Sequence, residues 1–283
     1  MPRAPLARTT VRDALDSALI AITAAGSESP RLDAELLLAE AMGTDRAALI
    51  ADPGRELDPE AAGAFRDMAR RRAQREPVAY ILGRKGFRRL ELAVDPRVLV
   101  PRPETEHVVE AALALPHGAR VVDVGTGSGA IALALADERP DLRVLATDSS
   151  ADALAVARAN AARLGIEVEL LQGDLLKPVA GPVDAVVSNP PYVARDDPLP
   201  PEVSRYEPAG ALYAGDDGLA VLRRLAPAAA AAGAAFCAFE VGEGQAPAVE
   251  DLLREAGFDE VERVRDLAGV ERVVVGRERG QTP

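Results

Sequence analysis

Apolar residues recur at helical spacing through the first part of the chain. One such stretch covers residues 11–24, and a second covers residues 30–42 with a proline in its first turn. A third begins after Asp58, a residue type that caps helix N-termini, and continues to about residue 74. Glycine and proline separate these stretches, so we predict a small domain of short bundled helices over residues 1–83.

Alternating apolar and polar positions follow the helical region. Residues 86–100 read GFRRLELAVDPRVLV and contain a turn signal at Asp95-Pro96, which together predict a β-hairpin. We therefore expect a hairpin linker over residues 84–102. The next stretch, residues 104–115, has the pattern of a helix.

From residue 119 onward, strand and helix patterns alternate along the chain. Such alternation predicts an α/β fold with a doubly wound, mainly parallel sheet and helices on both faces. We expect this second domain to occupy residues 103–283. The expected strands lie at 120–124, 142–147, 168–171, 183–187, 234–239, 261–265 and 272–275, and the expected helices at 130–138, 151–164 and 246–256.

Composition narrows the class of protein. The chain has 283 residues, of which 48% are hydrophobic and 28% are charged, as in ordinary globular domains. A net charge of −12, from 33 Lys and Arg against 45 Asp and Glu, argues against a nucleic-acid partner bound through its phosphates. With one cysteine, Cys237, and two histidines, the sequence predicts neither an intrachain disulfide nor a Cys/His zinc site.

No membrane or secretion signal is visible along the chain. The sequence contains no run of ~18 apolar residues. Its first residues, MPRAPLARTTVRDAL, lack the apolar core of a signal peptide. We therefore expect a soluble, cytoplasmic protein with no membrane partner.

A basic cluster covers residues 66–89. It holds nine Arg or Lys residues against two acidic residues, Asp67 and Glu76. Such a run is typical of a solvated helix face followed by a charged turn, and it also suits a contact surface for an acidic partner. The sequence leaves both interpretations open.

A glycine-rich loop joins the first expected strand to the helix after it. The loop reads Asp123-Val-Gly-Thr-Gly-Ser-Gly129, and glycines let a backbone turn tightly and approach a ligand closely. In a doubly wound sheet this loop lies at the carboxyl edge, where ligands bind. Asp148 ends the next strand, where a carboxylate can accept hydrogen bonds from the ribose hydroxyls of an adenosine-bearing cofactor. We therefore assign cofactor binding to Gly125, Thr126, Gly127, Ser128, Gly129 and Asp148.

Two adenosine cofactors fit this loop. The spacing G-x-G-x-x-A at residues 125–130 satisfies the dinucleotide fingerprint, so a nicotinamide-dependent dehydrogenase stays open. The third glycine and Asp123 favour S-adenosylmethionine, because this carboxylate can meet the ammonium group of the methionine moiety directly or through water. After the third strand, Asp174 can accept from the adenine amine and Leu175 can cover the ring, although Gly-Asp is also a common turn pair.

The segment Asn189-Pro-Pro-Tyr192 follows the fourth expected strand. Pro190 and Pro191 stiffen it, which presents the Asn189 side-chain oxygen and the Pro190 carbonyl as paired acceptors. An amide or aromatic amine nitrogen with two hydrogens matches this pair, and Tyr192 can pack on its flat face. Such nitrogens are weak nucleophiles, and fixing the line of attack can supply roughly 7–11 kcal/mol. We assign Asn189, Pro190 and Tyr192 to catalysis, all four residues to substrate binding, and Asn189 also to the cofactor.

The ordered set of motifs resembles a known family. The glycine loop, the aspartate after the second strand and the NPPY segment are similar to those of class I S-adenosylmethionine-dependent methyltransferases acting on amino or amide nitrogen, which have a seven-stranded sheet. Residues 77–83 with Phe87, the PRPETE stretch within 99–106, and residues 205–218 resemble the release factor glutamine methyltransferases. The resemblance covers residues 30–277.

This resemblance implies a substrate, a cofactor and a partner. The family methylates the side-chain amide of the glutamine in the Gly-Gly-Gln motif of class 1 peptide chain release factors. S-adenosyl-L-methionine donates the methyl group and becomes S-adenosyl-L-homocysteine, and no metal takes part. The resemblance also implies that the N-terminal helical domain contacts the release factor.

Other functions remain compatible with the residues alone. A DNA or RNA methyltransferase acting on an exocyclic base amine uses the same acceptor geometry with a flipped-out base. The charge of −12 and the lack of a target-recognition segment count against it. A cofactor-binding module without catalysis is a weaker alternative, because the methyl-acceptor motif is intact.

A few polar residues near these motifs have no role that follows from the sequence. Arg102 and Glu104 belong to the PRPETE stretch, and a part in shaping the rim of the site is the hypothesis for both. Glu240 ends the fifth expected strand, where it either faces the ligand edge or lies at the surface. Cys237, in the same strand, is expected to be a buried small hydrophobic residue.

Overall fold

The computed structural model describes residues 9–278. Residues 1–8, part of the stretch expected to carry no signal peptide, lie outside the described residues. Among the described residues, no helix has both the length and the apolar character to cross a membrane. The chain divides into two compact units, which we call the helical unit (Met1–Gly83 and Pro200–Tyr206) and the sheet unit (Arg84–Leu199 and Glu207–Pro283).

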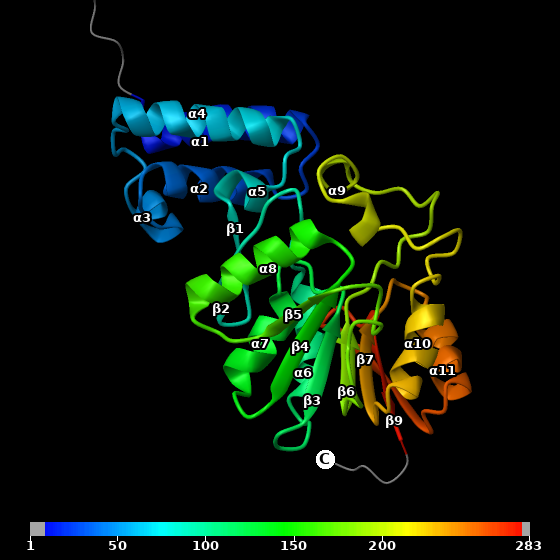
Figure 1. Ribbon diagram of the computed structural model, residues 1–283. Helices are drawn as coiled ribbons and strands as arrows, with labels where there is room; N and C mark the ends of the chain where they lie inside the picture. Colours follow the sequence, from blue (N-terminus) through cyan, green and yellow to red (C-terminus); the bar gives the residue numbers. More distant parts are fainter. Residues whose placement is uncertain (1–8, 279–283) are drawn as a thin grey trace, which may run out of the picture. The chain divides into compact units, whose positions relative to one another are not determined.

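Short helices build the helical unit (Figure 1). They are α1 (Val11–Ala24), α2 (Pro30–Ala41), α3 (Arg46–Ala51), α4 (Pro59–Ala73), α5 (Val78–Leu82) and α9 (Pro201–Ser204). Thr10 and Asp13 form a reciprocal capping box at the start of α1. The Asp58 carboxylate accepts from the Ala61 N–H at 2.8 Å and caps α4. The predicted N-terminal helical region is confirmed, with α3 and α5 as helices that the pattern did not predict.

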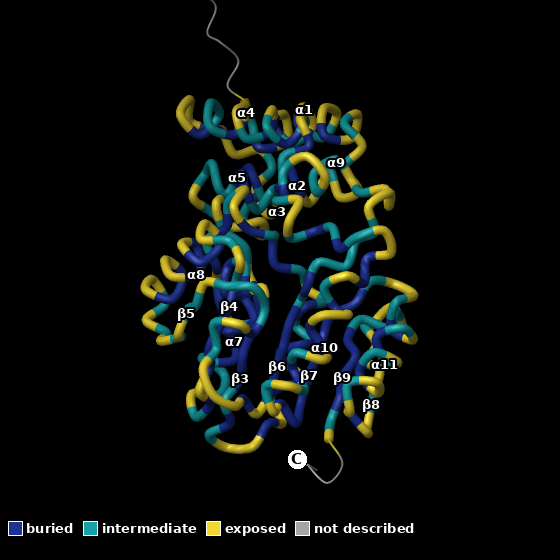
Figure 2. The backbone as a smooth tube through the Cα atoms, turned by 45° about the vertical axis from the view of Figure 1, so that its right-hand side comes forward, coloured by how far each residue is buried: buried dark blue, intermediate teal, exposed yellow. Residues whose placement is uncertain are grey.

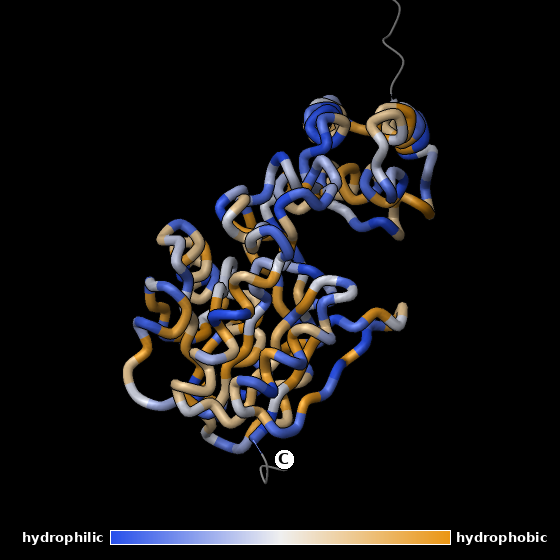
Figure 3. The backbone as a smooth tube through the Cα atoms, turned by 90° about the vertical axis from the view of Figure 1, so that its right-hand side faces the viewer, coloured by the Kyte–Doolittle hydropathy of each residue, from blue (hydrophilic) through white to orange (hydrophobic). Residues whose placement is uncertain are grey.

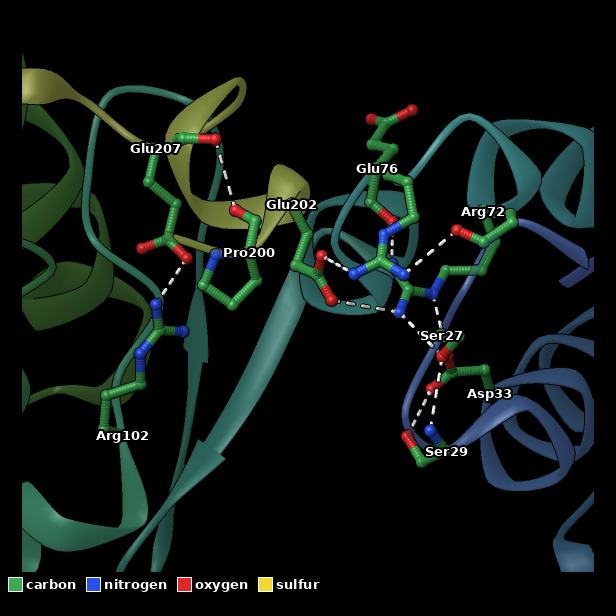
Figure 4. A network of polar contacts seen from close by, with 12 residues as sticks. Ser27, Ser29, Asp33, Arg72, Glu76, Arg102, Pro200, Glu202 and Glu207 are labelled. Carbon is green, nitrogen blue, oxygen red and sulfur yellow. Dashed lines mark hydrogen bonds and ion pairs between the residues drawn. The ribbon is translucent and has the colours of Figure 1, made fainter. Parts of the chain in front are cut away.

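Buried charges hold α9 within the helical unit (Figure 4). Arg72 and Arg75 are only 5% and 8% exposed, and both pair with Glu202 of α9. Arg72 also donates to the Asp33 carboxylate at 2.7 Å. These ion pairs explain why a segment that follows the NPPY motif in the sequence belongs to the N-terminal helices.

Loss of the Arg72 guanidinium is expected to destabilise the helical unit. Arg72→Ala leaves the Asp33 carboxylate buried without its ion pair, and breaking a buried pair costs about 3–5 kcal/mol. Urea unfolding of the full chain, followed by circular dichroism, measures this loss. The matched control is Arg66→Ala on α4, an exposed position where the change should stay within about 0.5 kcal/mol. Equal unfolding free energies for the two variants would contradict the role of the buried pair.

Nearby carboxylates neutralise much of the basic cluster of residues 66–89. Arg72 is buried in the helical unit, so it contributes to no contact surface. In the sheet unit, Arg88 pairs with two glutamates, at 2.8 and 2.6 Å. Exposed members such as Arg66 and Arg70 are the ones that a partner could reach.

The sheet unit begins with an antiparallel hairpin of β1 (Arg84–Phe87) and β2 (Leu90–Ala93). Its turn lies at Arg88 and the residue after it, so the hairpin turn predicted at Asp95-Pro96 was wrong. A turn does occur there, closed by the Val98 N–H to the Asp95 carbonyl at 3.1 Å, but it follows the hairpin. Arg88 takes a left-handed φ of 51° without the glycine or asparagine that usually marks such turns. Its side-chain ion pairs hold this conformation instead.

Seven strands of the described chain form the central sheet, in the order β5-β4-β3-β6-β7-β9-β8 (Figure 1). The first five in this order run parallel, and β9 is antiparallel to both of its neighbours. This confirms the predicted α/β, doubly wound, mainly parallel sheet. The strands are β3 (Arg120–Val124), β4 (Arg143–Asp148), β5 (Glu169–Gln172), β6 (Ala185–Ser188), β7 (Phe236–Glu240), β8 (Glu260–Arg265) and β9 (Glu271–Arg277).

Helices cover both faces of the sheet, whose central strands are buried (Figure 2). Hydrophobic and hydrophilic segments alternate along the backbone (Figure 3). One apolar cluster contains side chains of α6 and α7, and a second contains side chains of α10 and α11. The sequence pattern did not predict α10, which contains an alanine-rich run. The helical elements are η1 (Pro103–Thr105), α6 (Glu106–Ala112), α7 (Ala130–Glu138), α8 (Ala151–Leu164), η2 (Ala209–Ala211), α10 (Leu222–Ala231) and α11 (Ala246–Glu255).

Candidate active site

The glycine loop and the NPPY segment leave the sheet from neighbouring strands. Asp123 of β3 lies in register with Val187 of β6. Residues 125–129 and 189–192, which follow these strands, therefore emerge at the same carboxyl edge. The strand order reverses between β3 and β6, and ligands bind at such switch points in doubly wound sheets.

Positive φ angles and backbone bonds shape the glycine loop. Gly125, Gly127 and Gly129 have φ angles of 74°, 57° and 87°, which other residues rarely adopt. The N–H groups of Gly125 and Thr126 donate to the Thr147 carbonyl of β4 at 2.8 and 3.0 Å. A Cβ atom on Gly125 or Gly127 would meet nothing within 4 Å, so the loop leaves open space beside it.

The Asp148 carboxylate lies against this loop. One of its oxygens accepts from the Gly127 N–H at 2.9 Å, and the other accepts from the Ser150 N–H at 2.8 Å. Each carboxylate oxygen can accept more than one hydrogen bond. The side chain can therefore hold the loop and still accept from the hydroxyls of a ligand.

Asp123 lies beneath the loop rather than beside the open space. It is fully buried, and one oxygen accepts from the Thr126 hydroxyl at 2.6 Å and from the Ala132 N–H at 3.1 Å. Burial raises the pKa of this carboxyl to about 7. The other oxygen, Oδ1, has no hydrogen-bond partner among the described residues. In this conformation the Asp123 carboxyl therefore exposes no atom that could make the direct contact with a ligand ammonium group that the sequence predicts.

A cavity of about 370 Å³ opens at the carboxyl edge of the sheet. Four of the predicted site residues do not line this cavity: Thr126, Ser128, Gly129 and Tyr192. Of these, Thr126 and Ser128 are buried. The predicted site residues that do line it are Gly125, Gly127, Asp148, Asp174, Leu175, Asn189, Pro190 and Pro191.

The residues expected to meet an adenine ring lie on the cavity wall. The Asp174 carboxylate pairs with Lys177 at 2.7 Å and with Arg224 at 2.5 Å, and both cations keep its pKa below the usual range. These ion pairs compete with a contact from this carboxylate to a ligand amine. Leu175 adopts a left-handed φ of 53°, a conformation rare for leucine that marks functional positions in other folds. This leucine remains a candidate for covering the ring.

The Asn189 side chain is fixed by a buried threonine. Its Nδ2 donates to the Thr105 hydroxyl at 2.9 Å. This bond occupies the amide nitrogen, and Asn189 lines the cavity, so Oδ1 is the atom of this amide that is left to accept a hydrogen bond from a ligand. The preceding residue, Ser188, donates to the Val124 carbonyl at 2.6 Å and ties the end of β6 to the end of β3.

Tyr192 is held at both its hydroxyl and its carbonyl. The hydroxyl donates to Glu240 Oε1 at 3.3 Å, and burial raises the pKa of this phenol. The carbonyl accepts from Gln245 Nε2 at 2.9 Å. Gly218, at a φ of 75°, approaches so closely that a Cβ atom there would lie 2.2 Å from this carbonyl oxygen. The glycine that follows the motif thus makes room for the NPPY backbone.

Several contributors to the site were not predicted from the sequence. Arg102 forms an ion pair of 2.5 Å with Glu207, which is buried (Figure 4). The Glu207 carboxylate also accepts a hydrogen bond from the Val100 N–H. These bonds join the PRPETE stretch and the residue before it to the segment after the NPPY motif. The buried Asn160 of α8 bonds the Ala93 backbone at 2.7 and 3.0 Å, and the carbonyl of the loop serine at 2.9 Å. A lone buried asparagine within a helix gives no signal that could have found this link.

Comparison with known proteins places the chain among methyltransferases. It matches the PrmC N-terminal domain over residues 13–83 and the methyltransferase small domain over residues 105–199. It is 46% identical to the release factor glutamine methyltransferase of Caulobacter vibrioides over 89% of this chain and 91% of the relative. The chain belongs to the release factor glutamine methyltransferase family. The relative from Mycolicibacterium smegmatis is 43% identical over 94% of this chain and 97% of its own length.

A solved structure supports the fold of this family member. A methyltransferase from Pyrococcus furiosus is similar with a TM-score of 0.51 and 19% identity, over 67% of this chain and 89% of that chain. Membership of the family makes the protein a methyltransferase. This decides against the dehydrogenase and the binding module without catalysis that the sequence left open.

Proposed function

We propose that the protein transfers a methyl group from S-adenosylmethionine to the side-chain amide of the Gly-Gly-Gln glutamine of a class 1 release factor. The anchored Asn189 carries this proposal, because Thr105 occupies its amide nitrogen and both Asn189 and Pro190 line the cavity, where their oxygens can act as paired acceptors. Two acceptors match the two hydrogens of a primary amide. The names of the relatives favour this substrate over a nucleic-acid base.

The residues at the cavity fit the cofactor. Gly125 and Gly127 leave room for its methionine and ribose parts, and Asp148 supplies acceptors for the ribose hydroxyls. The buried Asp123 carboxyl lies beneath the same loop and holds it through the Thr126 hydroxyl and the Ala132 N–H. When bound, S-adenosylmethionine supplies an electrophilic methyl group on a sulfonium.

The protein's own contribution to the reaction is orientation. The Asn189 oxygen and the Pro190 carbonyl hold both amide hydrogens of the glutamine, which aims the nitrogen and removes alternative poses. Pro190 and Pro191 stiffen the backbone that carries these acceptors. No strong base is required if the amide proton leaves after the methyl group has been transferred.

A methyl-transfer assay tests the function. Purified protein, labelled S-adenosylmethionine and an intact release factor are incubated together, with duplex DNA in a parallel reaction, and mass spectrometry locates the methyl group. Label on the Gly-Gly-Gln glutamine supports the proposal. Label on DNA alone would be consistent with the proposed role of Asn189 but would contradict the proposed release-factor substrate.

We further infer that the helical unit binds the release factor through the exposed arginines of α4. Charge reversal of Arg66 and Arg70 is expected to raise KM for intact release factor about tenfold, because it replaces long-range attraction by repulsion. The kcat should hold within about twofold, and a short Gly-Gly-Gln peptide should be methylated as before. Arg72 is unsuited to this test because it is buried. Unchanged kinetics on the intact factor would refute this surface.

A further inference from the structure

The side-chain amide of Gln245 joins three segments of the sheet unit. Its Nε2 donates to the Tyr192 carbonyl at 2.9 Å and to the Asp217 carbonyl at 3.3 Å. Its Oε1 accepts from the Gly242 N–H at 2.9 Å. The amide therefore connects the end of the NPPY segment to the turn before α10 and to the residues that follow β7.

This set of partners fixes which way the amide points. A glutamine amide has two N–H donors and an oxygen that only accepts. The nitrogen faces two backbone carbonyls and the oxygen faces a backbone N–H, so a flipped amide would place like groups against each other at all three contacts. A glutamate here would lose both donors. The position therefore requires the amide itself and not only a side chain of this size.

Two glycines leave the space that this amide occupies. A Cβ atom on Gly218 would lie 2.6 Å from Gln245 Nε2, and a Cβ atom on Gly242 would lie 2.9 Å from Gln245 Oε1. Gln245 also occupies the N-cap position of α11, where its side chain makes no capping hydrogen bond. Serine, threonine, aspartate and asparagine are the usual residues at that position. The glutamine side chain thus holds the neighbouring segments instead of capping its own helix.

Anchors at both ends hold the NPPY segment. Asn189 Nδ2 donates to a buried threonine at one end, and the Tyr192 carbonyl accepts from Gln245 at the other. The Tyr192 hydroxyl donates to Glu240, which is buried and not at the surface. The two prolines between the anchors fix their own φ angles but leave ψ free. The direction of the Pro190 carbonyl depends on those ψ angles, and therefore on both anchors.

We propose that Gln245 is a positioning residue that sets the direction of the Pro190 carbonyl by holding the Tyr192 end of the NPPY segment. Gln245 lies outside the lining of the cavity, so it acts through the backbone of the segment and not on the reacting atoms. The inference rests on the proposed function, because the direction of this carbonyl matters for catalysis only if it accepts a hydrogen of the substrate amide.

Kinetics of matched variants test this role. Gln245→Met keeps the length of the side chain and removes its three hydrogen bonds, and Gln245→Glu places a carboxylate against two carbonyls. We expect kcat to fall about tenfold in the first variant and about 100-fold in the second, with KM for release factor and Kd for S-adenosylmethionine within about twofold. The control is Gln172→Glu, the same substitution at an exposed position, which should keep all three within about twofold.

One carbonyl signal reports the anchor directly. The chain contains a single Tyr-Val pair, at residues 192–193. Full-length protein labelled with ¹³C at the tyrosine carbonyls and with ¹⁵N in valine therefore gives one cross-peak between a carbonyl carbon and the amide nitrogen that follows it. The ¹³C shift of this peak should change in both Gln245 variants, because the carbonyl loses a hydrogen-bond donor. It should stay unchanged in Gln172→Glu.

The two measurements separate this inference from the proposed function. The spectrum requires no substrate, so a changed carbonyl shift in the variants, without release-factor methylation by the wild type, would leave the anchor in place and contradict the proposed function. An unchanged shift, or a kcat for Gln245→Glu within twofold of wild type, would overturn the positioning role. Equal losses of kcat and of cofactor affinity would overturn it as well, because they would assign Gln245 to the stability of the fold.

Discussion

Replacing Asn189 with alanine is expected to lower kcat for release factor methylation by at least about 10³-fold, with Kd for S-adenosylmethionine within about threefold. In the proposed mechanism the side-chain oxygen is one of two acceptors that aim the substrate nitrogen, and alanine offers no replacement. The cofactor keeps its other predicted contacts, to the glycine loop and to Asp148. Single-turnover methylation with labelled cofactor measures the rate, and isothermal titration measures the affinity.

An exposed amide at the same sheet edge provides the control for this prediction. Gln172 ends β5, and Gln172→Ala should stay within about twofold of wild type in both measurements. A near-normal turnover for Asn189→Ala would refute the alignment mechanism. A rate loss accompanied by an equal loss of cofactor affinity would instead move Asn189 to the cofactor side of the site.

The sequence predicted the parts of this protein that depend on local pattern. Strand and helix periods gave the α/β fold, because the central strands and the helices packed on them bury apolar side chains. The glycine loop and the NPPY segment carry rare backbone requirements, positive φ angles in one and two fixed φ angles in the other. These requirements restrict the residue types, so the motifs were visible without a structure.

The parts that the sequence did not predict depend on contacts between distant residues. The hairpin turn at Arg88 is held by ion pairs to glutamates far along the chain, and no turn residue marks it. The attachment of α9 to the helical unit depends on Arg72 and Arg75, which read in the sequence as members of a surface cluster. Their burial gives these two arginines a structural role in place of the expected surface role. A buried arginine pairs with a specific carboxylate, whereas an exposed arginine does not require a partner.

The anchoring of Asn189 was hidden for the same reason. Its side-chain nitrogen donates to Thr105, a residue 84 positions earlier in the chain. No local pattern connects the two. The resemblance to a family placed the PRPETE stretch near the site, and the structure adds how its threonine takes part.

Removing the Asp148 carboxylate is expected to weaken cofactor binding more than any other single change in the glycine-loop region. Hydrogen bonds to a charged group contribute about 1.5–3 kcal/mol each, so losing two to the ribose raises Kd for S-adenosylmethionine by about 10²–10⁴-fold. Asp148→Ala also releases the Gly127 and Ser150 N–H groups that the carboxylate holds. Isothermal titration with S-adenosylmethionine and with S-adenosylhomocysteine measures the loss.

Two further variants separate the causes of that loss. Asp152→Ala removes an exposed carboxylate four residues further on and should leave Kd within about twofold of wild type. Asp148→Asn keeps the size of the side chain but replaces one acceptor oxygen by a donor, which then faces either the Gly127 N–H or the Ser150 N–H and removes acceptor capacity for the ribose hydroxyls. It should therefore bind the cofactor nearly as weakly as the alanine variant. Wild-type cofactor affinity in Asp148→Asn would show that the size of the side chain, and not its second acceptor oxygen, is what the cofactor requires. Unchanged affinity in Asp148→Ala would show that this residue does not contribute to cofactor binding.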